Sequence, residues 1–305
     1  ISQSSSGNGY ITFTTEISDT NSDNTKLKVE YSDDDGNTWF DPYLVSANAN
    51  AGTISLDNTQ TYQIGTTDAI DSSTGAKTLT IVWDTQSASN GNGAVTGDQS
   101  DIKVRVTPND TSASGSAAAS SSFEVDNQAP SSLASLASST TTVSTVALTW
   151  TAATEANFNH YEIWYDDEAS INRGVTDTEW DNSDDANLAT RTTTSTTITG
   201  LTSNTSYYFK IWAVDNFGNE LTITEINAST VSIFVTSVLT NTNATPKIGA
   251  SVPFTATIVN NGGITANNTL FTVTLPSNMS YIVNSIRIND VVKTDAIDAD
   301  NSNYN

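Results

Sequence analysis

The chain has 305 residues, of which 34 are acidic and 11 basic, so its formal net charge is -23. One histidine and no cysteine exclude disulfides, thiolate zinc sites, cysteine nucleophiles and metal sites built on several imidazoles. So acidic a chain repels nucleic acid and anionic lipid, and no apolar run approaches the roughly 18 residues of a membrane helix. We therefore expect neither nucleic-acid binding nor membrane insertion.

Short alternating runs of apolar and polar residues recur along the chain, separated by Gly, Asn, Asp and Ser, and helical periodicity is almost absent. Examples are 10–14, 27–31, 103–107 and 271–275. This pattern predicts an all-β protein of tandem β-sandwich domains. Composition shifts at 112–130 and 227–230 predict three domains, at 1–127, 128–230 and 231–305.

The first segment contains Ser32-Asp-Asp-Asp-Gly-Asn-Thr-Trp39, which resembles the Asp-box of sialidase-like propellers. A propeller needs several blades at a regular period, and sialidase chemistry needs clustered arginines, whereas the four here are dispersed. We interpret Asp34, Gly36 and Trp39 as the structural residues of one hairpin turn. The segment as a whole loosely resembles Ig-like modules of bacterial surface proteins.

The second segment contains Val146-Ala-Leu-Thr-Trp150 and Gly200-Leu-Thr-Ser-Asn-Thr-Ser-Tyr207. The first resembles strand B of a fibronectin type III domain with its tryptophan, and the second matches that family's Gly-Leu-x-x-x-Thr-x-Tyr. The resemblance implies a sandwich in which Tyr207 is the corner tyrosine that ties a turn to the backbone. The long Asp-rich stretch at 166–196 departs from the family pattern.

Alternation along the two central strands of this domain directs three aromatic side chains outward, those of Trp164, Tyr208 and Trp212. Because these strands are neighbours in the family fold, the three predict one surface patch for a subunit contact or a glycan. The equally weighted alternative is that the 166–196 insertion folds over the patch.

The third segment contains Pro246-Lys-Ile-Gly-Ala-Ser-Val-Pro-Phe254, Ala256-Thr-Ile-Val-Asn-Asn-Gly-Gly263 and Phe271-Thr-Val-Thr-Leu-Pro276. These motifs resemble the DUF11-type Ig-like repeat of prokaryotic surface proteins. In such repeats further strands follow the segment that corresponds to 298–304. We therefore expect an incomplete sandwich here, completed by later residues of the same chain or by a strand from another subunit.

Three groups of oxygen-bearing side chains are candidate calcium ligands, since calcium takes six to eight oxygens. None has EF-hand spacing, and solvated turns account for most such clusters in an Asp-rich chain. The groups are Asp19 with Asp23, Asp126 with Asn127, and Asp295, Asp298 and Asp300. No other cofactor is expected.

These features predict a non-enzymatic, extracellular structural protein, forming part of a surface filament, sheath, layer or large adhesin. Its partners would be copies of itself or neighbouring surface-protein subunits, with glycan as a further candidate. The start at Ile1 predicts a mature or excised segment. The alternative is an accessory region of a secreted polysaccharide-degrading enzyme, because fibronectin-type modules often space catalytic domains.

Overall fold

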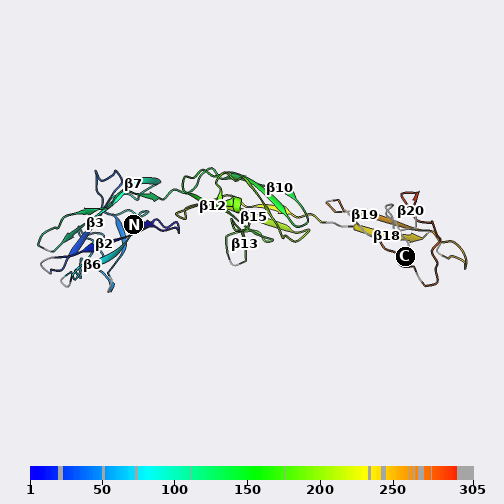
Figure 1. Ribbon diagram of the computed structural model, residues 1–305, viewed down its shortest axis with the longest axis horizontal. Helices are drawn as coiled ribbons and strands as arrows, with labels where there is room; N and C mark the ends of the chain where they lie inside the picture. The colour runs from blue at the N-terminus through cyan, green and yellow to red at the C-terminus, as the bar shows by residue number, and fades with distance from the viewer. Residues whose placement is uncertain are drawn as a thin grey trace. The chain divides into compact units, whose positions relative to one another are not determined.

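The structure is a computed structural model, whose strands are labelled in Figure 1. It divides into two compact units, residues 1–232 and 233–305. The units are described separately. The described residues are 1–19, 23–49, 52–72, 75–110, 112–174, 176–232, 235–241, 245–260, 262–263, 265–266, 271–275 and 277–293.

The first sandwich occupies residues 1–127 and consists of two antiparallel sheets. One sheet has the strand order β1-β2-β6-β4-β5, and the other has the order β3-β7-β8 with β9 also paired to β7. Their bounds are β1 Ser2–Gln3, β2 Tyr10–Ile17, β3 Lys26–Ser32, β4 Tyr43–Ala49, β5 Gly52–Thr53, β6 Lys77–Asp84, β7 Asp98–Asn109, β8 Ala118–Ala119 and β9 Phe123–Asp126.

The second sandwich begins after Asn127 and again has two sheets. The first has the order β10-β11-β14, and the second has β13-β12-β15-β16 with β17 paired to β15. The bounds are β10 Ala134–Thr141, β11 Val146–Thr151, β12 Phe158–Asp166, β13 Thr178–Trp180, the 3-10 helix η1 Ala186–Ala189, β14 Ser195–Ile198, β15 Ser206–Asp215, β16 Glu220–Thr222 and β17 Ile226–Ser229.

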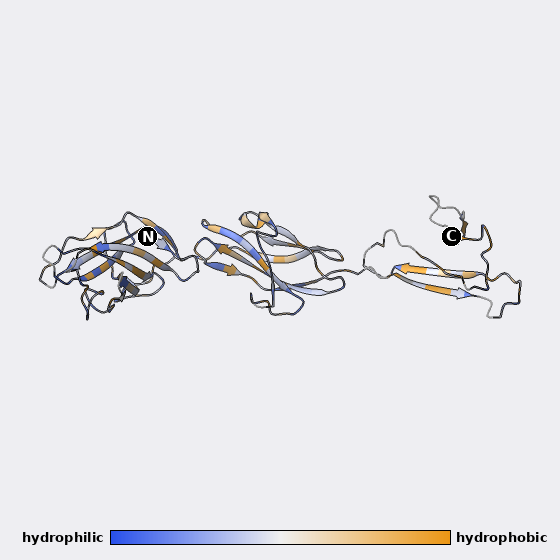
Figure 2. Ribbon diagram, turned by 60° about the horizontal axis from the view of Figure 1, so that its bottom comes forward, coloured by the Kyte–Doolittle hydropathy of each residue, from blue (hydrophilic) through white to orange (hydrophobic). Residues whose placement is uncertain are grey.

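Each sandwich has its own core, built from the inward members of the alternating strands. Figure 2 shows hydrophobic and hydrophilic residues following one another along these strands. In the second core, the Trp150 ring packs edge-on against Tyr161 with ring centroids 5.4 Å apart. The hydroxyl of Tyr207 accepts a hydrogen bond from the backbone N–H of Thr202, 3.0 Å away, which is the tie expected of a corner tyrosine. The insertion adds β13 to the sheet edge and buries Leu188 of η1 in the core.

Among the residues of the second unit that the structure describes, the strands are β18 Val235–Asn241, β19 Phe254–Asn260, β20 Arg287–Ile288 and β21 Val291–Val292, which form two separate two-stranded sheets. Phe271–Leu275, expected from its alternation to be a strand, lies outside the strands of the structure, so that prediction is wrong for this unit. The apolar side chains of the β18–β19 hairpin lie exposed.

These elements confirm the predicted fold class, which is all-β with tandem β-sandwich domains. In the portion of the chain that the structure describes, no helix has the length and apolar character needed to cross a membrane.

Candidate functional site

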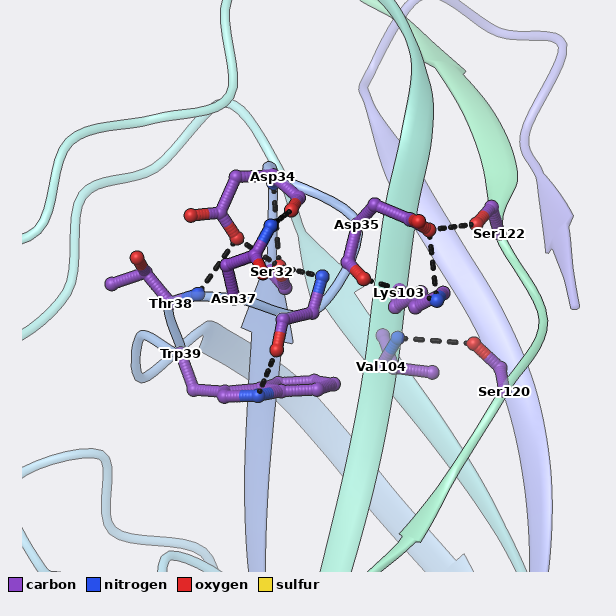
Figure 3. Close-up of polar contacts among 11 residues, drawn as sticks. Ser32, Asp34, Asp35, Asn37, Thr38, Trp39, Lys103, Val104, Ser120 and Ser122 are labelled. Carbon is purple, nitrogen blue, oxygen red and sulfur yellow. Dashed lines mark hydrogen bonds and ion pairs between the residues drawn. The ribbon is translucent and has the colours of Figure 1, made fainter.

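The turn after β3 is held by the side chains of Ser32 and Asp34 (Figure 3). Asp34 Oδ1 accepts hydrogen bonds from the Ser32 hydroxyl at 2.8 Å and from the Thr38 N–H at 2.7 Å. The Trp39 indole N–H donates to the carbonyl oxygen of Gly36, 3.0 Å away. Gly36 has a φ of +94°, which favours glycine at this point of the turn.

Hydrogen bonds from Thr38 and Ser32 lower the pKa of Asp34 to about 2, so this carboxylate is ionised at neutral pH. The Arg105 guanidinium lies 4.2 Å from the centroid of the Trp39 ring and pairs with Glu30. The hydrogen bonds of Ser32, Asp34 and Trp39 thus stay within the turn, as in a structural hairpin.

The aromatic patch predicted on β12 and β15 is covered in part. Trp212 is only 4% exposed because Arg173 of the insertion lies over its ring, 4.8 Å from the centroid. The same guanidinium forms ion pairs with Glu162 and Glu220. The prediction that Trp212 is exposed is therefore wrong. For this residue the alternative prediction, that the 166–196 insertion folds over the patch, is the one that the structure shows. Trp164 and Tyr208 are half-buried on the same face.

The calcium candidates differ in their surroundings. Asp19 and Asp23 lie on the loop that leaves β2, at the end of the first sandwich opposite the second domain. Asp295, Asp298 and Asp300 fall outside the described residues. Asp126 lies at the domain junction, where the structure brings it together with two carboxylates that the sequence did not single out.

These two are Glu155, on the loop from β11 to β12, and Asp215, the last residue of β15. One carboxylate oxygen of each of the three residues lies within 4.8 Å of the others. Asp126 and Asp215 are 0% and 1% exposed. The site therefore combines a residue of the first sandwich with one loop residue and one strand-end residue of the second.

Asp126 and Asp215 are fixed by hydrogen bonds. Asp126 Oδ2 accepts from the Asn157 side-chain amide at 2.9 Å, and its carbonyl oxygen accepts from the Asn219 amide at 3.0 Å. Asp215 Oδ1 accepts from the N–H groups of Phe217 and Asn219, both at 2.8 Å. Asn127 lies beside the cluster, but its side-chain amide donates back into the first sandwich, to Thr85 and Val95.

The electrostatics of the junction are unfavourable to negative charge. Burial, followed by the proximity of Asp126, raises the pKa of Asp215, and burial raises the pKa of Glu155 with further contributions from Asp126 and Asp215. Burial and the charges of Asp126 and Glu124 raise the pKa of Asp98 as well. Within the described residues, no Lys or Arg lies at ion-pair distance from any of these carboxylates.

The two sandwiches also touch through their backbones. The Gly7 N–H donates to the carbonyl oxygen of Phe217 at 2.9 Å. A Cβ atom on Gly218 would overlap the Ser5 carbonyl oxygen and the Gly7 nitrogen. Both glycines also have positive φ values, so the approach depends on glycine at each position.

Chemically, the cluster offers carboxylate and carbonyl oxygens, the ligands that calcium prefers. The sequence pointed to Asp126 but missed Glu155 and Asp215, because loops distant in the sequence bring them together. The strand order of the fold could have indicated Glu155 and Asp215, because it places the loop after β11 and the end of β15 at the end of the domain where the chain enters.

That strand order and the Tyr207 tie are those of a known family, whose model matches residues 128–228. Residues 128–228 form a fibronectin type III domain. The DUF11-type resemblance of the third segment stays a prediction.

The chain is similar to exoglucanase B of Cellulomonas fimi, with 32% identity over 142 residues. The match covers 45% of this chain and spans only 10% of the length of that protein. Among solved structures, the FN1–FN3 domains of chicken CNTN1 match at 14% identity over 75% of this chain and 65% of that one, with a TM-score of 0.41. The FN5 domain of Drosophila Lar matches at 16% identity over 33% and 96%, with a TM-score of 0.24.

Proposed function

We propose that this chain is a non-catalytic spacer region of a larger extracellular protein, in which the first sandwich and the fibronectin type III domain act as one stiff body. The observation that carries the proposal is the direct backbone contact of Gly7 with Phe217 and Gly218. Two domains joined by a flexible linker usually move relative to each other, and they do not require close contact between their backbones. The Asp126 hydrogen bonds to Asn157 and Asn219 support the same reading.

The parent protein would be a polysaccharide-degrading enzyme. The similarity to exoglucanase B supports this choice, although that match spans a tenth of the relative. A structural part of a surface assembly is the second candidate, and the exposed apolar hairpin of residues 235–260 favours it. The coding sequence on either side of the chain separates the two, since a hydrolase domain supports the first and further β-sandwich repeats support the second.

The stiffness can be measured with two spin labels. The chain has no cysteine, so Thr14→Cys on β2 and Ser138→Cys on β10, both exposed, take one label in each domain. We expect one narrow distance distribution by pulsed electron resonance. Gly218→Ala forces its new Cβ into the Ser5 carbonyl and should broaden the distribution.

The matched control is Gly200→Ala, in the same domain. Gly200 also has a positive φ, so alanine is strained there to a similar degree, but nothing lies within 4 Å of the added Cβ. The distribution should keep its width in this variant. A broad distribution in the unmodified chain, or equal widths for the two alanine variants, would contradict the spacer proposal.

A further inference from the structure

Charge is distributed very unevenly along the chain. Residues 1–225 contain 30 of the 34 acidic side chains, whereas residues 226–286 contain a single charged side chain, that of Lys247. Two copies of this protein would repel each other through their first two domains. The second unit is therefore the region where identical copies can approach at little electrostatic cost.

The β18–β19 hairpin lies in this uncharged region and has one strongly apolar face. Its register pairs Leu239 with Ala256, Ser237 with Ile258 and Asn241 with Phe254. Because side chains alternate across a strand, Leu239, Phe254, Ala256 and Ile258 share one face. Leu239, Phe254 and Ile258 are each more than 40% exposed.

A two-stranded hairpin of this kind needs further contacts to be stable. An isolated two-stranded sheet is marginally stable in water, and stability needs further strands or a packed face. Natural edge strands are usually protected by charges or proline against pairing with other chains. Neither β18 nor β19 contains a charged residue or a proline, so the edge along residues 235–240 lacks these two kinds of protection. Among the described residues, β19 is the only strand paired with β18.

A segment suited to this edge is present in the same unit. Phe271-Thr-Val-Thr-Leu275 alternates strictly between apolar and polar residues, carries no charge and belongs to no strand of the structure. Phe271 and Val273 are 37% and 46% exposed. Added beside β18, this segment would extend the sheet and could place Phe271, Val273 and Leu275 on the same face as Leu239 and Ile258, so that the apolar face becomes wider.

We infer that the second unit binds a second copy of this chain, with residues 271–275 of each copy forming a strand beside β18 of the other. The contact is β-strand addition, in which backbone hydrogen bonds give affinity and the alternating apolar side chains give register. Reciprocal exchange closes into a two-fold dimer, whereas an exchange that cannot close gives a filament. This inference is independent of the spacer role of the first unit.

The test measures the mass of the full chain in solution by light scattering across a concentration series. We expect the mass to rise from 32.3 kDa to at least twice that value as concentration increases. Val273→Lys places a charge in the donated strand and should leave a monomer. Val45→Lys, at a valine of β4 that is 40% exposed, is the matched control and should associate like the unmodified chain.

Mixing two variants separates loss of contact from loss of folding. Leu239→Lys spoils the accepting face and Val273→Lys spoils the donated strand, so each alone should be monomeric. Their mixture still offers one intact strand and one intact face, and it should form dimers of one variant with the other. The inference is overturned if the unmodified chain stays monomeric at all concentrations, if Val273→Lys associates normally, or if the mixture does not associate.

Discussion

The turn after β3 and the domain junction use the same side chain, aspartate, in opposite ways. Asp34 and Asp215 each accept hydrogen bonds from two residues near them in the sequence. Asp34 is half-buried and those bonds lower its pKa to about 2, whereas deeper burial and the nearby Asp126 raise the pKa of Asp215. Hydrogen-bond donors alone therefore do not determine the charge state of a carboxylate. Burial and like charge can outweigh them.

The largest effect should come from removing the buried member of the pair. Asp215→Ala leaves the N–H groups of Phe217 and Asn219 without their acceptor, and we expect a loss of about 3 kcal/mol in the free energy of unfolding. Urea unfolding followed by tryptophan fluorescence measures this loss. Asp215→Asn keeps an acceptor oxygen and removes the charge that faces Asp126, so it should cost less than half as much. Equal losses would show that the charge itself holds the turn.

An intermediate effect is expected from calcium, whose binding at the junction remains a prediction. A cation held by Asp126, Glu155 and Asp215 would offset their mutual repulsion, and at ten times its dissociation constant it would add about 1.4 kcal/mol to stability. The unfolding temperature at pH 7 should therefore rise with added calcium. Glu155→Gln should abolish the rise and Asp19→Asn, at the distant loop, should not. An unchanged unfolding temperature, or the same rise in both variants, would exclude a junction site.

The smallest effect is the dependence of stability on pH, which should differ in sign between the two regions. The folded-state pKa of Asp98 is raised, so its contribution is present below its usual value of 3.8 and is lost as pH rises through the folded pKa. The pKa of Asp34 is lowered, so its contribution is present above 3.8 and is lost as pH falls towards about 2.

Unfolding temperatures from pH 2 to pH 7 test this difference. Asp98→Asn should flatten the decline in stability that begins above pH 3.8, and Asp34→Asn should flatten the decline below it. Each variant acts as the control for the other. A variant that flattened both sides, or the wrong side, would contradict the assigned directions.

The sequence predicted most of the first unit, because alternation and turn residues are local signals. The tie from Tyr207 to Thr202 followed from one short motif, and the Asp34 turn followed from another. Both motifs were found through their resemblance to known families, and each bond joins residues within a few positions of each other, so a short stretch of sequence was enough to locate it.

Features that depend on long-range contact were missed or predicted wrongly. Trp212 was expected outside because alternation says which way a side chain points, but not what another segment places over it. Arg173 reaches it from the insertion, whose path the sequence did not reveal. Glu155 and Asp215 were missed for a related reason, since only the strand order brings their loops to Asp126. Residues 271–275 were expected to form a strand because they alternate, but alternation does not specify which strand they would pair with.

The junction joins two kinds of contact with different sensitivities to their surroundings. The carboxylates respond to protons and to ions, whereas the approach of Gly7 to Gly218 involves only backbone atoms, which do not titrate. Acidity or dissolved salts would therefore change how strongly the two domains hold together without changing the angle between them. The backbone contact would therefore keep the distance between the two domains constant when pH or salt concentration changes.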